Sequence, residues 1–234
     1  YHEPYTTLVD ELHPLEELIS EVEKRAGRKL RVEENAFKQA WLARGWAGKA
    51  EALLQNGSPK HRIPAFKEII RKIPDNQLKD FSTYLTALRE LDMNHWNTFL
   101  PRDETPLITR FTKSECFDVI KHYEKNPVFA KAAAEIHRYN DFLLANAVDA
   151  GMLSVKAAMA MKNKYPHYVP FFREFYEAAE AQRNGTGKGF ANVGAVTKKM
   201  RGSTLDVVDP LEGIIRNTFS IMSANDRNKV GQSI

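Results

Sequence analysis

The chain has 234 residues, of which 43% are hydrophobic and 27% are charged. These values are typical of a globular protein and argue against an intrinsically disordered chain. The single cysteine, Cys116, excludes an internal disulfide and a zinc site built from several cysteines. No apolar run reaches the ~20 residues that a membrane-spanning helix requires, so we expect a soluble protein with no membrane-spanning segment.

Charge is distributed unevenly along the chain, although the net charge is only +4. The first 23 residues contain seven acids and no Lys or Arg, whereas five bases fall between Lys24 and Arg31. Acids early and bases late in a helix complement its dipole, so this pattern favours a solvent-exposed helix with well-matched ends. The chain begins with Tyr1 and stops within an apparent helix, so we expect it to be part of a longer protein.

Helical spacing of apolar residues dominates the first hundred residues. Gly27, the pair Asn56-Gly57 and Pro101 are typical helix stops, and two prolines enclose a short helix between them. The predicted helices span about residues 8–26, 33–56, 65–73 and 75–100.

The polar stretch 101–109 is the only clear pause before the second half of the chain, and we divide the protein there into helical regions 1–110 and 111–234. Thr112 and Glu115 form a capping box, Pro127 suits a first helical position, and Ser154 caps a shorter helix. No convincing period-2 run appears, so we predict an all-α fold, an elongated bundle with a glycine-rich loop before the last helix.

An aromatic corner is predicted where Pro166 and Pro170 prevent the helix from continuing. Its rings could close a packed corner between helices, or form a stacking platform for nucleic-acid bases with Lys162, Lys164 and Arg173. The rings that define this corner are Tyr165, Tyr168, Phe171 and Phe172.

A glycine-rich basic loop is predicted over about residues 183–203, and we expect it to be mobile. It lacks the glycine spacing and the preceding strand of a phosphate-binding loop. Its bases suit phosphate or an anionic protein partner equally. The candidate contacts are Arg183, Lys188, Lys198, Lys199 and Arg201.

Catalytic, cofactor and metal sites are not indicated by any motif. Asp92 and His95 share a helix face, as do His137 and Asp141, but neither pair belongs to a metal-binding motif. Cys116 has no evident His partner and is expected to be buried. We therefore predict no catalytic residue, no cofactor and no metal.

The last helix is predicted to be capped by Asp209 and to begin at Pro210, with Glu212 favouring its dipole. A broad apolar stripe runs along it, while Arg216, Asn217 and residues 225–228 are expected toward the polar side and the end. Such a stripe must be covered by the chain itself or by a partner, and we favour a neighbouring domain or copy.

A combination of short patterns in the second half resembles a helical segment of the large polyvalent proteins of tailed phages and other mobile elements. The resemblance covers about residues 127–234. The residues that carry it are Tyr139, Asn140 and Asp141; Asp149, Ala150 and Gly151; Tyr168, Val169, Pro170 and Phe171; Gly202 and Ser203; and Asp209, Pro210, Glu212, Arg216 and Asn217.

The resemblance implies a context and no reaction. Such proteins are very large, are often packaged in the phage particle and are thought to enter the recipient cell with the DNA. We therefore expect a non-catalytic structural or interaction module that holds neighbouring domains or copies of its parent protein. Its expected location is the virion interior and then the host cytoplasm. A nucleic-acid-binding helical module of such a protein, with DNA among its candidate ligands, is the alternative, and an enzyme with an unrecognised site is the third.

Overall fold

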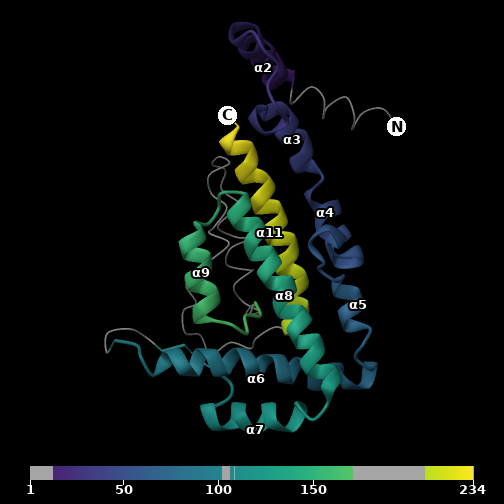
Figure 1. The fold of residues 1–234 in the computed structure, drawn as a ribbon, viewed down its shortest axis with the longest axis vertical. Coiled ribbons are helices and arrows are strands. Elements are labelled where there is room, and N and C mark those ends of the chain that lie inside the picture. The colour runs from purple at the N-terminus through teal and green to yellow at the C-terminus, as the bar shows by residue number, and fades with distance from the viewer. Residues whose placement is uncertain (1–12, 102–105, 108, 171–208, 234) are drawn as a thin grey trace, which may run out of the picture.

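The fold is all-α, as the sequence predicts (Figure 1). Within the residues that the structure describes, the β pairing consists of one isolated antiparallel bridge between Ser58 and Ile63. The structure is a computed structural model, and it describes residues 13–101, 106–107, 109–170 and 209–233.

Helices account for most of these residues, and short 3-10 turns precede α3, α5 and α6. The helices are α2 (His13–Ala26), α3 (Ala36–Arg44), α4 (Trp46–Asn56), α5 (Phe66–Ile70), α6 (Leu78–Asn97), α7 (Lys113–Tyr123), α8 (Pro127–Asp149), α9 (Val155–Lys164) and α11 (Pro210–Gln232).

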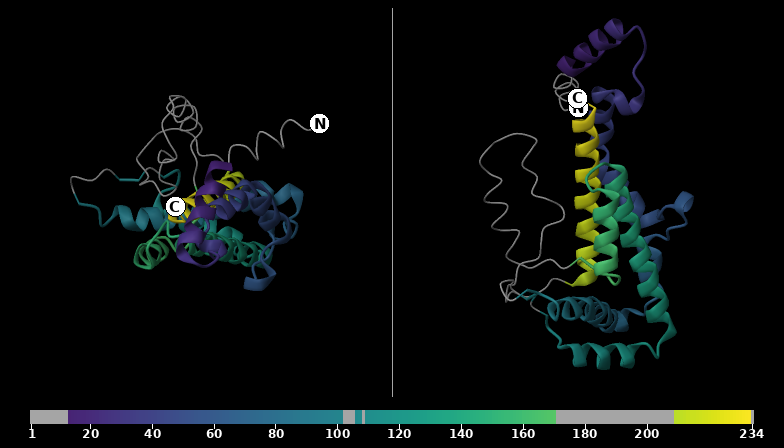
Figure 2. Two further views of the ribbon diagram at one scale, coloured as in Figure 1. Left: turned by 90° about the horizontal axis from the view of Figure 1, so that it is seen from above. Right: turned by 60° about the vertical axis from the view of Figure 1, so that its left-hand side comes forward.

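Two long helices, α8 and α11, lie side by side along the long axis of the molecule and run in the same direction (Figure 1). The α3–α4–α5 segment runs along one side of this pair, and α9 lies on the other side. At the base, α6 and α7 cross the long axis as an antiparallel pair. The α2 helix lies at the opposite end, beyond the upper ends of α8 and α11 (Figure 2).

The hydrophobic core lies where α6, α8 and α11 meet, and α4 and α5 also contribute to it. The rings of Phe81 and Phe129 pack edge to face with centroids 5.2 Å apart. The Tyr139 hydroxyl lies 3.1 Å from Thr218 Oγ1, and both side chains are completely buried. A buried hydroxyl pair needs such a partner, so this contact also fixes the alignment of α8 against α11. The core therefore draws side chains from both sides of the stretch 101–109.

Helix starts follow the sequence predictions closely. Thr112 Oγ1 accepts a hydrogen bond from the Glu115 backbone N–H, and the Glu115 carboxylate accepts one from the Thr112 N–H. Ser154 and Asp209 cap α9 and α11 by accepting from backbone N–H groups, and Pro127 is the first residue of α8. These signals are local, and the local sequence suffices to read them.

Helix interiors depart from the predictions at two places. The helix expected over residues 33–56 is two helices, because Gly45 both ends α3 and begins α4. Glycine has a low helix propensity, and it allows the chain to change direction there. The helix expected over 65–73 is limited to α5, and the next begins at Leu78 after a 3-10 turn.

The last helix also corrects two expectations. Most of its apolar stripe packs against α3, α4, α6 and α8, so the chain itself covers most of this stripe, while Ile215 is 38% exposed. Trp46 on α4, for example, packs edge to face against Phe219 with ring centroids 6.2 Å apart. Asn217 and Asp226, expected on the polar side, are instead 7% and 8% exposed. Lys49 of α4 reaches Asp226 with a 2.6 Å ion pair, which compensates its burial.

Candidate interaction site at the aromatic corner

The aromatic corner follows α9 and packs against α6 and α8, as the first of the two sequence alternatives requires. Asn140 of α8 donates its side-chain amide to the Tyr168 carbonyl oxygen at 2.9 Å. Val169 is completely buried, whereas Tyr168 is 36% exposed. A packed corner would bury the Tyr168 ring, but the buried residues at this point of the corner are Val169 and Pro170. Phe171 and Phe172 lie outside the described residues.

A buried arginine lies beneath this corner. Arg89 of α6 is 2% exposed, and its guanidinium carbon lies 4.0 Å from the Tyr165 ring centroid and 5.0 Å from that of Tyr168. Its Nε and Nη1 atoms have no hydrogen-bond partner. Burial lowers the pKa of Arg89, but an arginine side chain remains charged in a protein. The two ring faces, together with the nearby Asp92 carboxylate, therefore compensate the buried charge of Arg89.

An aspartate on the same helix fixes the middle of the corner. Asp92 accepts hydrogen bonds from the His167 backbone N–H at 2.8 Å and lies 3.0 Å from His167 Nδ1. The His137 ring packs against His167 with centroids 5.4 Å apart. Burial, and then the neighbouring His167, lower the pKa of His137 to about 4. His137 is therefore neutral near pH 7.

These contacts revise the residue pairs that the sequence suggested. Asp92 faces His167 of the corner and not His95 of its own helix, while Asp141 forms a 2.6 Å ion pair with Lys162. Among the described residues, no group of three or more His, Cys, Asp or Glu side chains is arranged to hold a metal ion. Asp92 and His137 thus belong to one polar cluster with Arg89 and His167.

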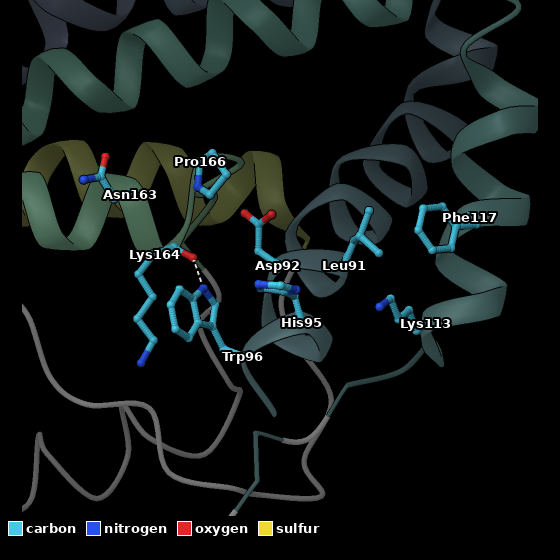
Figure 3. Close-up of a pocket in the computed structure, with 9 residues that line it drawn as sticks. All are labelled: Leu91, Asp92, His95, Trp96, Lys113, Phe117, Asn163, Lys164 and Pro166. Carbon is cyan, nitrogen blue, oxygen red and sulfur yellow. Dashed lines mark hydrogen bonds between the residues drawn. The ribbon is translucent and has the colours of Figure 1, made fainter. Parts of the chain in front are cut away.

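A pocket of about 380 Å³ opens beside this cluster, between α6, α7 and the residues at the end of α9 (Figure 3). The Trp96 indole N–H donates to the Lys164 carbonyl oxygen, the bond drawn as a dashed line. The Lys164 ammonium lies 5.3 Å from the Trp96 ring centroid. The lining residues are Leu91, Asp92, His95, Trp96, Lys113, Phe117, Asn163, Lys164 and Pro166.

The only cysteine is not placed for nucleophilic chemistry. Cys116 is completely buried, and burial raises the pKa of its thiol to about 11. The thiol therefore stays protonated near pH 7, and a protonated thiol is a poor nucleophile. Nearby, the buried carboxylate of Glu90 accepts hydrogen bonds from the backbone N–H groups of Arg110 and Phe111, which anchors the entry to α7.

Each remaining candidate residue either belongs to α11 or its N-terminal cap, or lies outside the described part of the chain. Asp209 caps α11, and Glu212 pairs with Arg216 one turn later on the helix surface. Asn217 is buried. The five basic residues of the predicted loop, Arg183, Lys188, Lys198, Lys199 and Arg201, fall in 171–208, which the structure does not describe.

Sequence reasoning missed Arg89 and the link between Asp92 and His167. One signal was present, because Arg89 lies four residues after Leu85 and eight after Phe81, on the apolar face of α6. A charged residue on such a face needs an interacting partner, and helical periodicity does not identify which residue that is.

Comparison of the chain with protein families, with curated proteins and with solved structures finds no match. In the described residues, no helix is long and apolar enough to cross a membrane.

Proposed function

We propose that the chain is a non-catalytic interaction module of a large phage internal or ejected virion protein, and that it holds neighbouring domains or copies of that protein together. Its place would be the virion interior and, after delivery, the host cytoplasm. Two features support the proposal: the positions of the residues that resemble large polyvalent proteins, and the exposed apolar side chains at one end of the molecule.

The residues that carry the resemblance are used for packing. Tyr139 joins α8 to α11 through Thr218, and Asn140 holds the aromatic corner. The Ala150 carbonyl oxygen, at the end of α8, accepts hydrogen bonds from Asn228 at 2.6 Å and from Gln232 at 3.2 Å. Tyr139, Asn140 and Ala150 thus each join one part of the fold to another, which is expected of residues in a structural module.

The observation that carries the proposal is the apolar surface of α2 and its surroundings. Leu18 and Val22 are 54% and 40% exposed, and their four-residue spacing places them on one helix face. Val32 and Leu42, on the turn before α3 and on α3, are also exposed. This surface lies at the end of an elongated molecule, where a neighbour can reach it (Figure 2). A contiguous apolar patch is typical of a protein interaction site, whereas an isolated exposed pair is not, and these four residues come from three consecutive elements at one end of the molecule.

Self-association measured by sedimentation velocity tests the proposal. The chain should associate as its concentration rises, and the association should persist at about 0.5 M salt because apolar contacts are not screened. The double variant Leu18→Glu with Val22→Glu should remain monomeric.

The matched control places the same two charges, at the same spacing, on Val155 and Met159 of α9, which are 58% and 63% exposed. This control should associate as the unchanged chain does. A chain that is monomeric at every concentration and salt, or a control that loses association equally, would contradict an interaction surface on α2.

A further inference from the structure

We propose that the pocket between α6, α7 and the end of α9 binds single-stranded nucleic acid, with bases against its aromatic side chains and the neighbouring phosphates on its two lysines. Trp96 of α6 and Phe117 of α7 supply the rings. Lys164 and Lys113 reach the pocket from different sides, the first from the end of α9 and the second from the start of α7 (Figure 3).

The charges of the pocket favour an anionic ligand. Neither Lys113 nor Lys164 forms an ion pair with another residue of the described ranges. Among the described residues that line the pocket, Asp92 is the one acid, and both its carboxylate oxygens are engaged by His167. Two ammonium groups therefore remain available for phosphate, which lysine binds as a point charge.

The aromatic side chains favour a flat ligand. Phe117 is 53% exposed, an unusual position for a large apolar ring that has a core beside it. The Trp96 ring is held in place, because its N–H is bonded to the Lys164 carbonyl oxygen. Every base has a face that stacks on such rings, so exposed aromatic rings beside lysines are typical of single-strand binding without sequence preference.

The size of the pocket also favours a nucleotide unit. Its volume of about 380 Å³ lies near the lower end of the ~300–1,000 Å³ of small-ligand sites. A docked helix, with its diameter of ~10–12 Å, would need a longer groove. In a duplex the bases are stacked on each other, so only an unpaired base can enter.

Fluorescence anisotropy with a labelled oligothymidylate, and with a duplex of the same length, tests the site. The single strand should bind more tightly than the duplex. Phe117→Ala should weaken this binding about tenfold, since stacking on one ring contributes ~1–3 kcal/mol per base. Phe117 is largely exposed, so this variant should fold normally, which circular dichroism checks.

The lysines are tested through the salt dependence of the affinity. Lys113→Gln and Lys164→Gln should each make the slope of log affinity against log salt less steep by ~0.7, the value for one phosphate contact on a single strand. The matched control is Lys60→Gln, which removes the same charge from the turn between α4 and α5, outside the pocket.

Three outcomes would overturn the site. The oligothymidylate does not bind, or Phe117→Ala binds it as tightly as the unchanged chain does, or Lys60→Gln lowers the salt slope as much as the pocket variants do. Displacement of the oligonucleotide by an equal concentration of polyglutamate would also contradict stacking, because that polymer offers charge without rings. None of these results depends on whether the chain self-associates through α2.

Discussion

The helices α2 and α11 have apolar residues at the same spacing and reach opposite outcomes. In α11, Ile214 is completely buried and Ile221 is 9% exposed, whereas in α2 the corresponding face exposes about half of Leu18. Four helices surround α11, but α2 packs against α3 at the end of the molecule. Periodicity therefore predicts that a helix has an apolar face, and the rest of the chain decides whether that face is covered.

Polar contacts near α2 and within α11 also differ in their exposure to solvent. Near α2, Glu34 pairs with Arg28 at 2.8 Å and with Arg31 at 3.0 Å, and these hydrogen bonds, that of Arg28 first, lower the pKa of Glu34 to about 2. The pairs lie on the surface, so solvent screening leaves them little influence on stability. In α11, by contrast, the contact between Thr218 and Tyr139 is buried and would leave unsatisfied groups if broken.

The largest expected effect comes from truncating the same kind of side chain in the two helices. Ile214→Ala should lower the free energy of unfolding by ~2–5 kcal/mol, because it leaves a cavity in the core. Leu18→Ala should change it by no more than ~0.5 kcal/mol, because the side chain is already solvated. Urea unfolding followed by circular dichroism, at a concentration where the chain is monomeric, measures both. Equal losses would mean that α2 is as well packed as α11.

The stability contributed by the buried corner should depend on pH through His137, unlike the apolar contributions of α2 and α11 compared above. His137 has a folded-state pKa of about 4 against an ordinary value of 6.5, so the unfolded chain binds more protons between these pH values. The stability that neutral His137 contributes is complete above about pH 6.5 and is lost as the pH falls toward about 4. The full difference corresponds to about 3 kcal/mol.

Urea unfolding at a series of pH values, for the chain and for His137→Gln, measures this contribution. The variant should lose less stability between about pH 7 and pH 4 than the unchanged chain does, whatever its stability at neutral pH. Parallel pH profiles would show that His137 is not the group responsible.

The smallest expected effects concern the start of α11. Asp209→Ala removes the cap on the Leu211 N–H and should cost ~1 kcal/mol. Glu212→Gln removes an exposed pair with Arg216 one turn away and should cost only ~0.2–0.5 kcal/mol. Thermal unfolding of the two variants compares them directly. A larger loss from Glu212→Gln would indicate that the surface pair, and not the cap, stabilises this helix start.

The sequence allowed prediction wherever the physical cause is local. Thr112, Ser154 and Asp209 accept from backbone N–H groups two or three residues away, and these caps are confirmed. The all-α class is confirmed for a similar reason, because it follows from the spacing of apolar residues.

Tertiary contacts account for what could not be predicted. Asp226 is polar and was assigned to the solvent side, but a lysine on α4 makes its burial tolerable. The corner was recognised from its prolines and rings, whereas its dependence on Arg89 and Asp92 required knowing that α6 passes beneath it. Partners that are far apart in the chain leave no pattern in a single sequence.

The ion pair between Lys49 and Asp226 joins residues that are 177 positions apart. Contacts over such separations require long loops to close, and proteins rich in them fold slowly. During synthesis, α3 and α4 leave the ribosome long before α11 exists to cover them. At ~5–20 residues per second, their apolar faces would wait on the order of ten seconds or more. The apolar faces of α3 and α4 therefore depend on α11 to cover them. We expect nascent chains that stop before α11 to aggregate or to recruit chaperones.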